Sequence, residues 1–114
     1  MTALRAATAW TAVVVVLCLI PGSGLPEIDA PVSTDKWVHV AMFVGVGGLW
    51  SLAHPRRPWA VLGLGSALGA AIEVAQHAMG WGRSGDPWDV VADVVGLALG
   101  VGLARAAAAR ERAP

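Results

Sequence analysis

Long apolar segments occupy most of this chain, and segments of such length commonly lie in a lipid bilayer. They cover residues 3–20, 35–53, 59–79 and 88–109, and stretches rich in Pro, Gly or Arg separate them. A hydrocarbon core of about 30 Å needs roughly 20 apolar residues in a helix that rises about 1.5 Å per residue. Lipid offers the backbone no hydrogen bonds, so each segment is expected to be helical. We therefore predict an all-α fold, an integral membrane bundle of four transmembrane helices in a single domain, residues 1–114.

Composition supports this class and argues against others. The chain is 56% hydrophobic and 14% charged, whereas soluble domains have about 25% charged residues. Its net charge is zero, and charges this sparse form no basic face, so no nucleic acid is expected as a partner. The single cysteine, Cys18, excludes a disulfide or a cysteine-based zinc site within one chain.

The first apolar segment has two interpretations. Arg5 precedes an apolar run over residues 6–20, and small residues follow at 22–24. This order is typical of a cleavable signal peptide as well as of a retained transmembrane helix. The three later segments already make an integral membrane bundle, so we favour retention and keep cleavage as the alternative.

The positive charges predict how the bundle is oriented. Loops on the cytoplasmic side carry an excess of Lys and Arg. If both termini are cytoplasmic, that side receives six of the eight cations, Arg5, Arg56, Arg57, Arg105, Arg110 and Arg112, and the outer side receives Lys36 and Arg83. We therefore predict an N-in, C-in protein of the cell membrane.

Ionisable and amide side chains interrupt the apolar segments near the ends that this orientation places outside. They are Asp35 and His39 in the second predicted helix, Glu73 and Gln76 in the third, and Asp89 and Asp93 in the fourth. Each buried charge costs about 2.5–3.5 kcal/mol to insert, so such groups normally mark function or a specific internal partner. Because they share one membrane depth, we predict a single polar cluster near the extracytoplasmic face.

Small residues continue these polar faces toward the other end of the helices. Gly65 and Gly69 precede Glu73 on the third predicted helix, and Gly96 and Gly100 follow Asp93 on the fourth. Glycines four residues apart let helix backbones approach closely in lipid. We therefore expect the third and fourth helices to form the main packing seam, with the cluster at its outer end.

These motifs resemble the VanZ-like membrane proteins, a family named after a protein associated with teicoplanin resistance. The matching residues are Asp35-Lys36-x-x-His39 with Phe43, then Glu73-x-x-Gln76, Arg83, and Asp89-x-x-x-Asp93-x-x-Gly96-x-x-x-Gly100. The resemblance covers about residues 35–103. Many relatives have Asn where Asp93 stands, so this chain carries an additional negative charge. The resemblance implies a multi-helix protein of the bacterial cell envelope, without implying a particular reaction.

The candidate site follows from the cluster and from the resemblance. The catalytic candidates are Glu73, Asp89, His39 and Asp93, and the ligand-binding candidates are Arg83, Gln76, Asp35 and Lys36. Glu73 or Asp89 would act as general acid or base, Asp35 would tune His39, and Arg83 would hold an anionic group.

Two hypotheses for the function come from different classes. In the first, an outward-facing pocket acts on or binds a cell-wall or lipid-linked molecule and affects glycopeptide susceptibility. In the second, the protein is a non-enzymatic binding or assembly protein whose polar network only fixes helix packing. A transporter or proton relay is less favoured, because four short helices in one protomer hardly enclose a path.

A metal is the remaining alternative for the cluster. His39 with Glu73, Asp89 and Asp93 would offer one imidazole and three carboxylates, which suit Mg²⁺, Mn²⁺ or Zn²⁺. The chain has no HExxH motif or comparable pair of histidines. We therefore expect no metal and no cofactor. The expected partners are membrane lipid and a lipid-linked or cell-wall molecule, and the oligomeric state is left open.

Overall fold

The predicted helices are all present in the computed structural model, which describes residues 2–20, 33–79 and 87–112. Helix α1 spans Ala3–Leu19, α2 spans Ser33–Ala53, α3 spans Pro58–Met79 and α4 spans Pro87–Arg112. The described ranges contain no strand. The prediction of an all-α fold is therefore confirmed. Helix α4 continues three residues beyond the predicted end at 109, because the alanine-rich segment before Arg110 favours helix even outside lipid.

Local sequence explains where the helices begin. The hydroxyl of Thr2 accepts a hydrogen bond from the backbone N–H of Arg5, at 3.2 Å, and so caps α1. Helices α3 and α4 both start at a proline, Pro58 and Pro87, a residue suited to the first helical position because its missing N–H would lack an intrahelical acceptor there. Asp89 adds a negative charge to the first turn of α4, where the helix dipole favours an anion.

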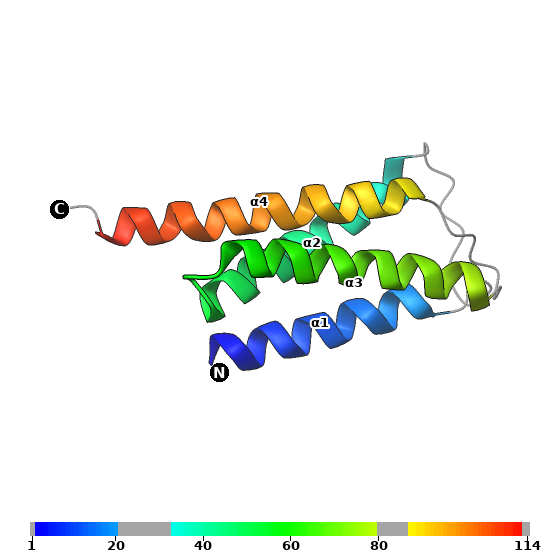
Figure 1. The fold of residues 1–114 in the computed structure, drawn as a ribbon, viewed down its shortest axis with the longest axis horizontal. Helices are drawn as coiled ribbons and strands as arrows, with labels where there is room; N and C mark the ends of the chain where they lie inside the picture. The colour runs from blue at the N-terminus through cyan, green and yellow to red at the C-terminus, as the bar shows by residue number, and fades with distance from the viewer. Residues whose placement is uncertain (1, 21–32, 80–86, 113–114) are drawn as a thin grey trace.

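The helices run up and down along the long axis of the molecule, which measures 52 Å (Figure 1). Helix α1 begins and α4 ends at the same end of the bundle, and α2 and α4 run parallel to each other. Three helices, α2, α3 and α4, are long and apolar enough to cross a membrane, and α1 is a shorter apolar helix. Large apolar side chains such as Leu64, Val74 and Leu99 are exposed on the outer faces, as expected for a surface covered by lipid.

Helix α2 packs most extensively against α4, so the predicted main seam between the third and fourth helices is wrong. A Cβ atom built at Gly96 would meet the carbonyl oxygen of Val40, and one built at Gly100 would meet the carbonyl oxygen of Val44. Gly96 and Gly100 therefore bring the backbone of α4 against the backbone of α2. The pattern of small residues indicated that α4 packs closely against a neighbour, but it could not indicate which one.

Gly65 and Gly69 of α3 do face α4, but they meet side chains there. A Cβ atom at Gly65 would lie 2.6 Å from Leu97 Cδ2, and one at Gly69 would lie 2.9 Å from Asp93 Oδ2. Leu97 is fully buried, together with Phe43 of α2 and Val14 of α1. Helix α4 thus places Gly96 and Gly100 against the α2 backbone and directs the side chain of Leu97 toward Gly65 of α3.

Tryptophan side chains attach α1 to α2. Trp10 Nε1 donates to the carbonyl oxygen of Met42 at 2.9 Å, and Trp50 Nε1 donates to Thr11 Oγ1 at 2.8 Å. Val14 and Cys18 of α1 are buried in the same core. Helix α1 is therefore an integral part of the bundle.

Candidate functional site

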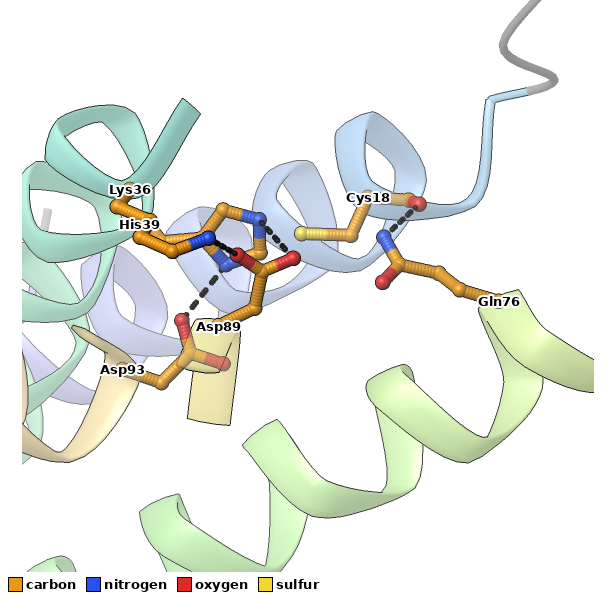
Figure 2. Close-up of polar contacts among 6 residues, drawn as sticks. All are labelled: Cys18, Lys36, His39, Gln76, Asp89 and Asp93. Atoms are coloured by element: carbon orange, nitrogen blue, oxygen red, sulfur yellow. Dashed lines mark hydrogen bonds and ion pairs between the residues drawn. The ribbon is translucent and has the colours of Figure 1, made fainter. Parts of the chain in front are cut away.

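The centre of the polar cluster is a hydrogen bond between α2 and α4. His39 Nδ1 lies 2.8 Å from Asp93 Oδ1, and the two residues are only 3% and 1% exposed (Figure 2). Because a carboxylate accepts hydrogen bonds, the imidazole Nδ1–H is the donor. This bond fixes the plane of the imidazole ring and directs its other nitrogen, Nε2, away from Asp93.

Asp89 lies on the Nε2 side of His39 and also meets Lys36. The distance from His39 Nε2 to Asp89 Oδ2 is 3.8 Å, and the distance from Lys36 Nζ to Asp89 Oδ1 is 3.3 Å. Lys36 therefore contacts Asp89, Asp89 faces His39, and His39 binds Asp93. We call these four residues the Lys–His network. Two carboxylates oppose one ammonium, so protonation of His39 would neutralise the network.

The parallel arrangement of α2 and α4 explains this pairing. Lys36 and His39 are three residues apart on α2, and Asp89 and Asp93 are four residues apart on α4. Such spacings put each pair on one face of its helix. Because both helices start at the same end of the bundle, the first turn of one meets the first turn of the other, and the next turns meet in the same way.

Helix α3 borders the network through Gly69. A Cβ atom at Gly69 would lie 2.9 Å from Asp93 Oδ2, so the absence of a side chain there leaves room for the carboxylate. Glu73 follows one turn later on the same face of α3. It is half-buried, and its Oε2 atom is buried. Glu73 therefore belongs to the side of α3 that faces the network.

Gln76 holds α3 to α1. Its amide Nε2 donates to the carbonyl oxygen of Cys18 at 2.8 Å, and the side chain is 3% exposed (Figure 2). Cys18 is in the last turn of α1, where the backbone carbonyl groups receive no hydrogen bond from an N–H of their own helix. Gln76 thus satisfies a helix end that lies away from water.

Two predicted ligand-binding residues lie outside the described part of the chain, namely the side chain of Asp35 and all of Arg83. The prediction that Asp35 tunes His39 stays a prediction. The bond from His39 to Asp93 was not predicted from the sequence. The spacing of Asp93 four residues after Asp89 could have suggested it, had the partner of α4 been known.

In residues 2–20, 33–79 and 87–112, no three His, Cys, Asp or Glu side chains form a group that could hold a metal ion. The geometry of the Lys–His network explains why its members do not form such a group. Both ring nitrogens of His39 are directed at carboxylates, so the imidazole and carboxylates face one another instead of a common central point.

Four apolar helices, with a network of His, Asp and Lys between α2 and α4, define a membrane protein with a polar site between its helices. The sequence model of the family described as VanZ/LLP1 matches residues 3–108, so this chain belongs to the VanZ/LLP1 family. The match includes α1 and extends beyond the motifs at residues 35–103. Membership of this family fits a membrane protein linked to glycopeptide resistance. Comparisons with curated proteins and with solved structures gave no match.

Proposed function

We propose that this protein is a multi-pass protein of the cell envelope whose Lys–His network binds or acts on a cell-wall or lipid-linked molecule at the outer face. Its presence would thereby alter glycopeptide susceptibility. The observation that supports this proposal is the buried bond of 2.8 Å between His39 Nδ1 and Asp93 Oδ1. An imidazole that a carboxylate holds in one orientation is suited to moving a proton at its other nitrogen.

The network supplies distinct roles for its members. Asp93 would orient His39, and His39 Nε2 with Asp89 would exchange a proton with the bound molecule. Lys36 is the most accessible member, with 29% of its side chain exposed against 6% for Asp89. Its ammonium group would attract a phosphate or carboxylate of the bound molecule and release Asp89 from the ion pair.

A second function is favoured by the burial of the same residues. His39, Asp89 and Asp93 are 3%, 5% and 1% exposed. A buried polar pair between two helices can have a purely structural role in which it fixes their register. Removing one partner then destabilises the protein. In this alternative the protein is a non-enzymatic binding or assembly protein.

The orientation proposed for the bundle is N-in, C-in, with the Lys–His network near the outer face. Its support is the distribution of charge along the described helices. Arg5, Arg57 and Arg105 lie toward the end of the bundle at which α1 begins and α4 ends, and Lys36 lies at the other end. Single cysteines introduced at the two ends, in a Cys18→Ala background, check the proposal. An impermeant maleimide should label position 37 in whole cells and leave position 110 unlabelled, and the reverse pattern would refute the orientation.

The functional hypothesis is tested by the variant Asp89→Asn. We expect a bacterial host that produces the wild-type protein to change its teicoplanin susceptibility, and we expect Asp89→Asn to lose that change completely at equal membrane abundance. The physical reason is that an amide can neither accept a proton nor hold Lys36 as an ion pair. General acid–base groups contribute about 10²–10⁴-fold to a rate, so the loss should not be partial.

Glu111→Gln is the matched control, because it makes the same acid-to-amide change at an exposed position of α4. Membrane abundance is quantified by immunoblot for all variants. If Asp89→Asn simply disappears from the membrane while Glu111→Gln does not, the network is structural and the second function holds. If the wild-type protein leaves susceptibility unchanged, the link to glycopeptides is refuted for this chain.

A further inference from the structure

A groove rich in arginine lies at the end of the bundle opposite the Lys–His network. It has a volume of about 1020 Å³ and is formed by the α2–α3 turn and the last turns of α4. Arg56 comes from the turn, whereas Arg105 and Arg112 come from α4. We call it the arginine groove. None of the described residues that line it is acidic.

The length of α4 creates this groove. Its 26 residues span about 39 Å at about 1.5 Å per residue, which exceeds a hydrocarbon core of about 30 Å. Figure 1 shows the last turns of α4 extending past the α2–α3 turn. The apolar span of α2 ends at Ala53 and that of α3 begins at Pro58. The groove therefore lies where hydrocarbon gives way to lipid headgroups.

The side chains of the groove have two kinds of chemistry. Guanidinium groups bind phosphate through paired N–H donors, and Arg56, Arg105 and Arg112 supply three of them. On the apolar side, Trp59 is 83% exposed and Leu52 is 55% exposed. Tryptophan at this depth is typical of the boundary between acyl chains and headgroups.

Ser51 is an independent indication of a ligand. It lines the groove and is 5% exposed, and its hydroxyl has no hydrogen-bond partner within the described residues. A buried hydroxyl without a partner is uncommon, because it loses the hydrogen bonds that water would provide. Rotation of the Ser51 side chain toward the groove would let a phosphate or glycerol oxygen supply one.

We infer that the arginine groove binds the phosphate of an anionic phospholipid, with Trp59 and Leu52 against its acyl chains. Two arginines on separate segments, Arg56 and Arg105, hold the phosphate, and Ser51 contributes its hydroxyl once its side chain rotates toward the groove. Bound lipid thereby joins the overhanging end of α4 to the α2–α3 turn. This site is separate from the Lys–His network and does not depend on the function proposed for it.

The test measures lipid binding to the full-length protein in detergent micelles by native mass spectrometry during titration with phosphatidylglycerol. The double variant Arg56→Gln/Arg105→Gln is expected to weaken this binding at least tenfold. The matched control Arg5→Gln/Arg110→Gln removes the same charge from the same end of the bundle at positions outside the groove. It should bind as the wild type does, and phosphatidylcholine should bind weakly to all three proteins.

Further tests distinguish a lipid phosphate from inorganic phosphate. They also show whether a loss of binding results from misfolding. Trp59→Ala should weaken phosphatidylglycerol binding, whereas inorganic phosphate should not displace the lipid. Arg105→Lys keeps the charge and should weaken lipid binding less than the double variant does. Equal weakening by the two double variants would overturn the site in favour of diffuse charge attraction. Displacement of the lipid by millimolar inorganic phosphate would overturn the assignment to a lipid.

Discussion

Gly100→Leu should push α2 and α4 apart and strongly reduce the stability of the bundle. A Cβ atom at Gly100 would meet the carbonyl oxygen of Val44 and would lie 2.7 Å from the backbone nitrogen of Gly48. These are backbone atoms, so no side-chain rotation relieves the clash. Overpacking typically costs about 1–3 kcal/mol, and we expect about 3 kcal/mol or more here because one whole helix must move.

Gly102→Leu is the matched control for this substitution. Gly102 is on the same helix, two residues later, and a Cβ atom there would meet nothing within 4 Å. Reversible unfolding in mixed micelles, followed by circular dichroism, measures the free energy of unfolding of both variants. Equal losses would show that glycine at position 100 is not required for the contact between α2 and α4.

Asp93→Leu should be the most harmful substitution within the Lys–His network. It leaves the imidazole Nδ1–H of His39 buried without its acceptor, and an unsatisfied buried donor costs about 1–3 kcal/mol. Asp93→Asn keeps an oxygen that can accept the same hydrogen bond, so its cost should be about 1 kcal/mol. The same unfolding experiment measures both variants.

The double variant His39→Leu/Asp93→Leu determines whether the effect belongs to the pair. Replacing both members of a buried pair by apolar residues is often neutral, so the double variant should recover most of the stability that Asp93→Leu loses. His39→Leu is measured as the second single variant. If its loss and that of Asp93→Leu add in the double variant, His39 and Asp93 do not act on each other and the bond of 2.8 Å contributes little.

The sequence alone determined the helices and the end of the bundle at which the polar residues gather. The bounds of α1 and α3 agree with the predicted ranges 3–20 and 59–79 within one residue. This succeeds because a helix in lipid satisfies its own backbone hydrogen bonds, so apolar length along the chain is sufficient information. Alternation of helix direction then brings residues 36–39 and 89–93 to one end.

The tertiary structure decided which side chains meet. His39 donates to Asp93 of α4, although the sequence suggested Asp35, its neighbour on the same helix. Gln76 binds the end of α1, and the arginine groove exists because α4 extends beyond the α2–α3 turn. Sequence spacing specifies which residues share a face of a helix. The partner of that face depends on how all four helices pack together, which is a property of the whole bundle.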